Sequence, residues 1–402
     1  MTRVRIPPTL RGEVGGQREV EASGSTLREV IDDLVGRFPG LGRQVLEDGN
    51  VAPFVNVYVN SEDARTLQGL DTPVETGSTV ILLPAMAGGE HALAPAPSLL
   101  DAVGRTPLVE LPRLAPHAGI RLYAKLEGQN PTGSIKDRVA KAMVEAAEAR
   151  GELEPGRELL EPTSGNTGIS LALVAKLKGY RLTCVVPENA TPERLQLLEL
   201  YGAEIVTSPA AQGSNGAVRQ ALRMAESDSR YVMLNQYGNE ANPRAHYEGT
   251  GAEIADTLDR VDMLVAGLGT GGTLMGTGAR LRESFPDVVV AAAEPLPGDE
   301  VMGLRSLEDG YVPPILDVAK LDRKILVSNE ESVAGMRELL DTEGIFGGVS
   351  AGAVAHVARR LAGELDDGIV VCILADGGWK YLSADFWEAA DVERSMERTV
   401  WW

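Results

Sequence analysis

The first 89 residues alternate between strand-like and helix-like apolar patterns. Val55, Val57 and Val59 alternate with Asn56 and Tyr58, which is the period of a half-buried strand. Thr26 followed by Glu29 is a capping-box pattern that predicts the start of a helix. Helical spacing continues at Leu27, Val30, Ile31, Leu34, Val35 and Phe38, and further strands are expected at Val4–Ile6, Glu19–Ala22 and Thr79–Leu83. This order predicts an α+β domain in which one helix packs on one sheet.

From Leu99 onward, apolar runs of strand length alternate with helix-length segments. The runs are Leu122–Leu126, Leu159–Leu160, Leu182–Val186, Met263–Ala266, Val288–Ala293 and Ile369–Leu374. Such an order predicts a mostly parallel α/β sheet, covered on both faces and divided over two lobes. Ligands of such folds bind at the carboxyl ends of the strands. Glu90–Ser98, rich in Ala and Pro, is predicted to be a linker between domains at 1–89 and 99–402.

The composition narrows the class of protein. A chain of 402 residues exceeds the size at which one core keeps growing, so two or three domains are expected. The formal net charge of −20 and the pI near 4.7 disfavour nucleic acid and anionic membranes as partners. No apolar run is long enough to cross a bilayer, and the N-terminus MTRVRIPPTL lacks the apolar centre of a signal peptide. The sequence therefore predicts a cytoplasmic protein.

Cysteine and histidine offer little for thiol or metal chemistry. Cys184 and Cys372 lie inside apolar strand-like runs, where an inert buried thiol is expected rather than a nucleophile. Their spacing suits neither a redox pair nor a metal site. The 4 histidines are not clustered, so no metal site is predicted.

Three polar loops follow strands of the second region. In the first, Ser134 is a possible helix cap that places Lys136 in the first turn of a helix. The positive end of a helix dipole lowers the affinity of a lysine for its proton, and Schiff-base chemistry requires such a lysine. A lysine at a helix start is, taken alone, more often a solvated surface group.

The other two loops can bind anions. Thr163–Gly168 (TSGNTG) precedes a helix expected from Ile169, and its backbone N–H groups can hold a carboxylate. Gly267–Thr273 (GLGTGGT) follows a buried strand, and its glycines let backbone amides close around a phosphate, although it lacks the lysine of a nucleotide P-loop. Each loop alone could be an ordinary turn, whereas the three in this order point to a shared site.

These loops, together with Gly347–Gly352 (GGVSAG), resemble the fold-type II pyridoxal-phosphate enzymes and, among them, the cysteine synthases. The resemblance covers residues 98–385, including Asn242–Tyr247 (NPRAHY) and Asp376–Tyr381 (DGGWKY). It implies a tryptophan-synthase-β-like fold in which Lys136 forms the Schiff base with pyridoxal 5'-phosphate. The other implied cofactor contacts are Asn166 to the ring hydroxyl, Gly269, Thr270, Gly271, Gly272 and Thr273 to the phosphate, and Ser350 to the ring nitrogen. The implied substrate contacts are Thr163, Ser164 and Thr167, at the carboxylate, and His246 is expected to be structural.

The resemblance also implies the reaction. A serine at the ring nitrogen leaves the ring largely neutral, which favours β-replacement over transamination. The implied course is abstraction of the substrate's Cα proton by the freed Lys136 amine, loss of the β-substituent to give an aminoacrylate, and addition of a sulfur nucleophile. Deamination of serine or threonine and threonine synthesis share the cofactor loops and are the alternative chemistries. Residues 163–168 and 346–353 resemble the β-replacement relatives more closely.

The N-terminal domain resembles the β-grasp sulfur-carrier proteins, a ubiquitin-like family that ends in Gly-Gly. The resemblance covers residues 1–89, with its strongest features in the strand Phe54–Asn60 and the tail Ile81–Gly89. Gly88 and Gly89 suit a tail that threads a narrow adenylating site. Here Gly89 is followed by Glu90, so its carboxylate is held in a peptide bond.

A carrier fused to a cysteine synthase resembles the branch that takes sulfur from a carrier thiocarboxylate. The resemblance implies O-phosphoserine as the preferred substrate over O-acetylserine, with Arg305 at the place of a phosphate-binding arginine. A guanidinium matches a phosphate with its fork of donors. By residue chemistry alone, a surface ion pair of Arg305 with Glu300 or Glu308 is about equally expected.

Two functions of the N-terminal domain remain open from the sequence. As a carrier cleaved at Gly89, it needs an adenylating or sulfur-transfer enzyme and a processing peptidase as partners. Alternatively, it is a docking or regulatory module on a sulfide-dependent O-acetylserine sulfhydrylase. The resemblance further implies a homodimer. The C-terminal residues Glu397–Trp402 are expected to fold back over the active site, because Trp401 and Trp402 are large apolar groups.

Overall fold

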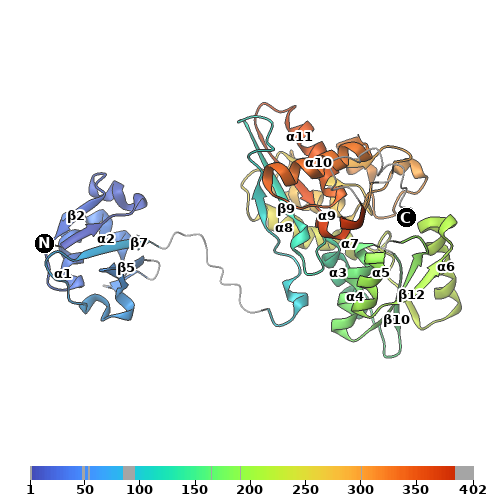
Figure 1. The fold of residues 1–402 in the computed structure, drawn as a ribbon, viewed down its shortest axis with the longest axis horizontal. Helices are drawn as coiled ribbons and strands as arrows, with labels where there is room; N and C mark the ends of the chain where they lie inside the picture. The colour runs from blue at the N-terminus through green and yellow to red at the C-terminus, as the bar shows by residue number, and fades with distance from the viewer. Residues whose placement is uncertain are drawn as a thin grey trace. The chain divides into compact units, whose positions relative to one another are not determined.

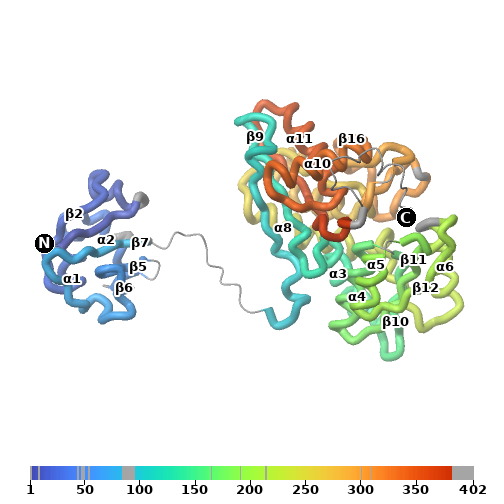
Figure 2. Tube along the Cα trace, viewed as in Figure 1, coloured from blue at the N-terminus to red at the C-terminus, as the bar shows by residue number. Residues whose placement is uncertain are grey.

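The computed structural model describes residues 2–47, 50–52, 55–84, 96–163, 165–190, 192–299 and 301–384 (Figures 1 and 2). Contacts divide the chain into two units, Met1–Pro95 and Ala96–Trp402, and each is described by itself. Several residues singled out in the sequence lie outside the described residues: Phe54, the tail and linker residues 85–95 with Gly88, Gly89 and Glu90, Ser164, Glu300, and Glu397–Trp402.

The first unit is a five-stranded sheet in the order β2-β1-β7-β5-β6, packed on one long helix (Figure 1). The central strands β1 and β7 run parallel, with Val4 opposite Val80, and the other pairs are antiparallel. The elements are β1 Thr2–Arg5, β2 Glu19–Ala22, α1 Leu27–Arg37, α2 Pro39–Val45, β3 Leu46–Glu47, β4 Asn50–Val51, β5 Val55–Val59, β6 Glu62–Asp63 and β7 Thr79–Pro84. Alternate residues of β5 are buried, as the sequence predicts for a half-buried strand.

The start of α1 has the predicted contacts between Thr26 and Glu29, and Ser25 adds to them. The Thr26 hydroxyl accepts a hydrogen bond from the backbone N–H of Glu29 at 3.4 Å, as predicted. The Glu29 carboxylate accepts from the backbone N–H and the hydroxyl of Ser25, each at 2.7 Å, and also from the backbone N–H of Thr26, and these bonds lower its pKa. The buried face of α1, from Leu27 to Leu34, then packs in the core of this unit with the inward residues of the sheet.

The second unit contains two sheets, as expected for a two-lobed α/β enzyme. One has the order β12-β11-β10-β13 and is parallel throughout, and the other has the order β16-β15-β14-β17-β9-β8, in which only β8 is antiparallel. The strands are β8 Leu108–Glu110, β9 Ile120–Leu126, β10 Glu158–Pro162, β11 Arg181–Pro187, β12 Glu204–Ser208, β13 Tyr231–Met233, β14 Met263–Gly267, β15 Val289–Pro295, β16 Arg323–Val327 and β17 Gly368–Leu374.

Helices connect and cover these strands (Figure 1). The helical elements are α3 Lys136–Ala149, α4 Asn166–Lys178, α5 Pro192–Tyr201, α6 Gly213–Ser227, α7 Ala241–Ala245, α8 Ala252–Ala255, α9 Gly272–Ser284, α10 Asn329–Glu343 and α11 Val349–Ala362, with a π-turn at His246–Gly251 and a 3₁₀ segment at Gly378–Ala384. Strand β9 pairs with β17 although about 240 residues of chain separate them, so the first and last parts of this unit share one sheet. None of the helices in the described part of the chain is long and apolar enough to cross a membrane.

Candidate active site

Two of the three predicted loops and the start of α11 meet at the carboxyl ends of parallel strands. One pocket is lined by residues of the first loop, the glycine-rich loop and α11: Lys136, Gly269, Thr270, Gly271, Thr273 and Ser350. Apolar residues from the ends of β14 and β17, Ala266 and Ile373, complete its wall. The second loop, Thr163–Gly168, does not line this pocket, but the Asn166 side chain connects it to Asp376 after β17. Residues far apart in the sequence therefore form one site at the position that parallel α/β sheets favour.

Lys136 is the first residue of α3 and is half-buried. The predicted cap is off by one residue, since Ile135 occupies the cap position, yet the Ser134 hydroxyl still accepts from the Lys136 backbone N–H at 3.3 Å. Burial lowers the pKa of Lys136, and the nearby Asp376 carboxylate acts in the opposite direction. A lysine with a lowered pKa provides a free amine more readily.

Buried charges anchor the first turn of α3. The Asp137 carboxylate accepts from the Thr132 backbone N–H at 2.7 Å and from the Ser170 hydroxyl at 2.5 Å, which ties α3 to α4. Arg138 forms ion pairs with Glu127 at 2.7 Å and with Glu253 at 2.6 Å. Because these partners lie on the stretch before α3, on α4 and on α8, they fix the direction in which α3 presents Lys136.

The second loop enters its helix earlier than predicted. Helix α4 begins at Asn166 and not at Ile169, because Asn166 and Thr167 already adopt the first helical turn behind Gly165. The buried Thr167 hydroxyl donates to the side-chain oxygen of Gln236 at 2.7 Å, while Thr163 stays half-buried. The loop thus presents backbone N–H groups at a helix N-terminus, the arrangement that binds carboxylates.

The glycine-rich loop is shaped for a close ligand approach. Gly271 has a φ of +88°, which disfavours other residues, and a Cβ on Gly269 would lie 2.9 Å from the carbonyl oxygen of Gly303. The Thr270 hydroxyl accepts from the Asn242 side-chain amide at 3.0 Å. Helix α9 begins directly after Gly271, so its N-terminus adds a positive dipole end to this loop.

His246 lies beside this loop and is buried. Its Nδ1 is 3.1 Å from the Thr250 hydroxyl, and its Nε2 is 3.3 Å from the Thr273 hydroxyl. Burial, with Lys136 and Arg138 nearby, holds its pKa well below 6.5. A neutral ring with both nitrogens near hydroxyls is consistent with the structural role predicted for it.

Arg305 lies on the segment that packs against the glycine-rich loop. Its backbone N–H donates to the Leu268 carbonyl at 2.7 Å, and its guanidinium lies 5.2 Å from the Tyr237 ring centre and 5.1 Å from the Tyr311 ring centre. Within the described ranges it has no carboxylate partner, so the surface ion pair with Glu308 does not form. Aromatic faces stabilise the guanidinium without neutralising it.

Four buried side chains near the site were given no role by the sequence: Glu161, Gln236, Asp376 and Lys380. Asn166 contacts two of them, since its side-chain nitrogen donates to Asp376 at 2.8 Å and its oxygen accepts from Lys380 at 2.7 Å. Asp376 lies two residues after the end of β17. Ligands of parallel α/β sheets bind at the carboxyl ends of the strands, so this position in the sequence could have suggested a role for Asp376.

Glu161 is the last residue but one of strand β10 and is 1% exposed. Its carboxylate accepts from the backbone N–H groups of Asn235 at 3.0 Å and Gln236 at 3.2 Å, which connects the second loop to the segment carrying Gln236. Burial raises the pKa of Glu161 from its ordinary 4.5 to about 7, although both backbone donors favour the charged form. Its contribution to stability is therefore present below about pH 4.5 and is lost as the pH rises through about 7.

Glu161→Gln is expected to remove this pH dependence, because an amide oxygen accepts the same two N–H groups without ionising. When the pH rises from 5 to 8, the free energy of unfolding of the wild type should fall by about 2 to 3 kcal/mol relative to that of the variant. Denaturant unfolding at both pH values measures it. Glu158→Gln, on the same strand, should instead destabilise at both, since Glu158 pairs with Arg181. Parallel stability curves for the wild type and Glu161→Gln would refute the assignment.

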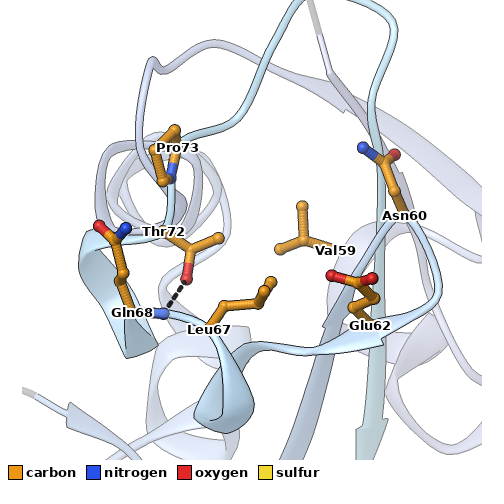
Figure 3. A pocket seen from close by; sticks show the side chains of 7 residues that line it. All are labelled: Val59, Asn60, Glu62, Leu67, Gln68, Thr72 and Pro73. Atoms are coloured by element: carbon orange, nitrogen blue, oxygen red, sulfur yellow. Dashed lines mark hydrogen bonds between the residues drawn. The ribbon is translucent and has the colours of Figure 1, made fainter.

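The N-terminal unit has a hollow of a different kind (Figure 3). Seven residues line it: Val59, Asn60, Glu62, Leu67, Gln68, Thr72 and Pro73. The Thr72 hydroxyl accepts from the Gln68 backbone N–H at 3.2 Å, so part of its polar lining is already bonded within the unit. These seven residues include neither a cation nor a nucleophile suited to catalysis. The candidate active site is therefore the pocket of the second unit that contains Lys136.

The cysteines agree with the sequence prediction. Cys184 and Cys372 are buried and free, and burial raises the pKa of both thiols, that of Cys372 to about 12. Across the residues that the structure describes, no group of three or more His, Cys, Asp or Glu is placed to hold a metal ion.

Comparison with known proteins identifies a matching family for each of the two units. Residues 99–376 match the family described as pyridoxal-phosphate dependent enzyme, and residues 4–89 match the ThiS family. Cysteine synthase B of Pseudomonas aeruginosa is 40% identical over 293 residues, covering 73% of this chain and 98% of that protein. Cysteine synthase B of Escherichia coli is 41% identical over 287 residues, covering 71% of this chain and 94% of that protein.

Solved structures agree with these relatives. A cysteine synthase from Entamoeba histolytica superposes with a TM-score of 0.71 at 31% identity, covering 78% of this chain and 96% of that chain. An O-ureido-L-serine synthase superposes with a TM-score of 0.70 at 37% identity, covering 74% of this chain and 96% of that chain. The predicted fusion of a β-grasp domain with a fold-type II α/β domain is thereby confirmed.

Proposed function

The chain belongs to the pyridoxal-phosphate dependent enzymes, among the cysteine synthases, and from this premise we propose that it makes cysteine from O-phosphoserine with sulfur from a carrier thiocarboxylate. The carrier is its own N-terminal domain, which matches the ThiS family. The observation that carries the choice of substrate is the Arg305 guanidinium, which lacks a carboxylate partner among the described residues and lies against two tyrosine rings beside the glycine-rich loop.

The residues of the site fit pyridoxal phosphate. The glycine-rich loop leaves no room for side chains at Gly269, and the N-terminus of α9 faces the same loop, so both suit a phosphate. We assign Gly269–Thr273 to the phosphate, Ser350 to the ring nitrogen and Asn166 to the ring hydroxyl. When bound, the cofactor draws electrons from the substrate's Cα and so allows the β-substituent to leave.

Lys136 is assigned as the residue that binds the cofactor covalently and exchanges the substrate's Cα proton. Its lowered pKa suits both tasks, because the amine must be free of its proton to act as a nucleophile or a base. Thr163, Ser164 and Thr167 are assigned to the substrate carboxylate. The backbone N–H groups at the N-terminus of α4 support this choice.

Arg305 is assigned to the leaving phosphate of the substrate. The aromatic contacts hold its guanidinium in place without using its five N–H donors, and a phosphate can accept two of them at once. An acetyl ester carries no charge for this group to bind. The arginine therefore discriminates between the two possible substrates.

The carrier has to be released before it can act. Sulfur activation needs a free carboxylate on Gly89, so we propose cleavage after Gly89, followed by adenylation and thiolation by partner enzymes. Attack of the thiocarboxylate sulfur on the substrate's Cβ, from which phosphate has left, would form a thioester between Gly89 and the cysteine sulfur. Transfer of the Gly89 acyl group from that sulfur to the cysteine amino group would give an amide, which a peptidase would hydrolyse to cysteine and the carrier carboxylate. Mass spectrometry of the chain isolated from its own cells tests the cleavage: a species ending at Gly89 supports it, and only intact chain contradicts it.

Gly89→Leu is expected to stop growth of cells that depend on this protein for cysteine from O-phosphoserine when sulfide is scarce. A branched side chain at the tail would block both processing and adenylation. Growth of the complemented strain is the measurement, with Gly12→Leu as the control, because Gly12 lies in the same unit and has open space around it. Undiminished growth with an intact chain on a denaturing gel would rule out the carrier role.

We also propose that the enzyme works as a homodimer in the cytoplasm, as its resemblance to cysteine synthases implies. Sedimentation equilibrium tests the assembly, with an expected mass of twice 42.7 kDa for the uncleaved chain. A mass of 42.7 kDa at micromolar concentration would contradict it.

A further inference from the structure

The segment that follows β17 joins the separate parts of the active site. The Ala375 carbonyl accepts from the Ile135 N–H at 2.8 Å, next to Lys136. The Asp376 carbonyl accepts from the Gly348 N–H at 3.1 Å, two residues before Ser350. This segment therefore contacts the lysine loop and the start of α11 through its backbone. Its side chains reach the remaining element of the site.

That remaining element is Asn166, whose side-chain amide is bonded at both ends. Lys380 donates to its oxygen at 2.7 Å, and its nitrogen donates to Asp376 at 2.8 Å. The reversed amide would turn its NH₂ group toward an ammonium and its oxygen toward a carboxylate, so only one orientation is favourable. The Asn166 nitrogen also hydrogen-bonds the Tyr381 hydroxyl, which itself contacts the same Asp376 oxygen, so one N–H can serve both of these acceptors and the other N–H can serve a ligand.

The two charged side chains that hydrogen-bond Asn166 are themselves buried. Lys380 is 7% exposed and Asp376 is 2% exposed. The Tyr381 hydroxyl donates to the same Asp376 oxygen that receives Asn166, while the second oxygen of Asp376 has no hydrogen-bond partner in the described part of the chain. Burial lowers the pKa of Lys380, and Asp376 and Asp137 act to raise it. Holding two charges in such a place is costly unless they make good bonds.

We propose that Lys380 is a positioning residue, which with Asp376 fixes and polarises the Asn166 amide so that its remaining N–H is a strong donor to the ring oxygen of the cofactor. A cation on the amide oxygen withdraws electrons from the nitrogen, and chains of hydrogen bonds strengthen one another in this way. The inference rests on the proposed assignment of Asn166 to the cofactor ring.

A purely structural role for Lys380 makes a different prediction. If Lys380 only balances Asp376 and Asp137, its removal lowers stability but leaves the bound cofactor unchanged. If it acts through Asn166, its removal changes the cofactor in the same direction as the removal of Asn166 itself. The effect must then vanish once Asn166 is gone.

The test is a double-mutant cycle of Lys380→Met and Asn166→Ala, read by the cofactor dissociation constant in equilibrium dialysis and by the visible absorption band. Each single variant is expected to weaken cofactor binding about tenfold, and the double variant to be no weaker than Asn166→Ala. The band should move in the same direction in all three. Lys380→Arg should restore most of the affinity, because it retains the cation.

Lys178→Met is the matched control, since Lys178 is also partly buried and bonded, to Glu148 at 2.8 Å, but does not line the site. It should leave affinity and spectrum unchanged. Additive losses in the double variant, or a Lys380→Met protein that binds the cofactor with the wild-type affinity and spectrum, would overturn the proposal. An Asn166→Ala variant with unchanged affinity and spectrum would instead show that the assignment of Asn166 to the cofactor is wrong. If Lys380→Met fails to fold, Lys380→Gln repeats the cycle.

Discussion

Lys136→Ala is expected to lose the visible absorption band of the lysine-linked cofactor and to slow cysteine formation by about 10³-fold or more. By the proposed assignment, the substitution removes both the covalent anchor of the cofactor and the amine that exchanges the substrate's Cα proton. The lowered pKa of Lys136, its place at the start of α3 and its position in the pocket of the glycine-rich loop all point to this result. Absorption spectra and steady-state rates of the purified variant measure it.

Lys141→Ala serves as the control for this experiment, because Lys141 lies on the same helix but donates to the Leu100 carbonyl at 3.0 Å instead of lining the pocket. It should keep the band and the rate. A borohydride-reducible lysine adduct that persists in Lys136→Ala would contradict the assignment of Lys136.

Arg305→Ala is expected to lower kcat/KM for O-phosphoserine by the equivalent of about 2–5 kcal/mol, while turnover of O-acetylserine changes little. The loss reflects a phosphate left without its charge-assisted partner. Tyr237 and Tyr311 remain in this variant, so the apolar side of the site is preserved. Parallel kinetics with the two substrates are the measurement.

Arg305→Lys separates charge from geometry. A lysine retains the charge but not the fork of donors, so it should recover part of the lost activity with O-phosphoserine. Equal losses with both substrates in Arg305→Ala would mean that Arg305 supports the structure of the segment and does not select the substrate.

The sequence predicted the elements whose apolar pattern is strong. Strand β5 was visible from the alternation at Val55–Val59, and β10, β11, β14 and β17 from continuous apolar runs. Four strands of the second unit were missed: β8, β12, β13 and β16. Each lies at an edge of its sheet, and none has the continuous burial of the central strands, so their sequences lack an unbroken apolar signal.

The site was predictable where a loop carries a local motif. Lys136, the glycine-rich loop and Ser350 come together as expected, because glycines and helix starts form short, recognisable sequence patterns. The contacts of Glu161 with Asn235 and of Lys380 with Asn166 have no such pattern, since each joins residues that are 74 or more positions apart. Burial of a charged side chain depends on tertiary packing and cannot be read from its neighbours in the chain.

One assay tests the central claim most directly: kcat/KM of the wild-type enzyme with O-phosphoserine and with O-acetylserine, each with sulfide and with thiocarboxylated residues 1–89 as the sulfur source. The carrier domain has its own core, which makes it suitable as a separate reagent. The proposed function predicts that O-phosphoserine with the thiocarboxylated carrier is the best pair and that cysteine becomes attached to Gly89. O-acetylserine with sulfide as the best pair, with the carrier inert, would contradict it.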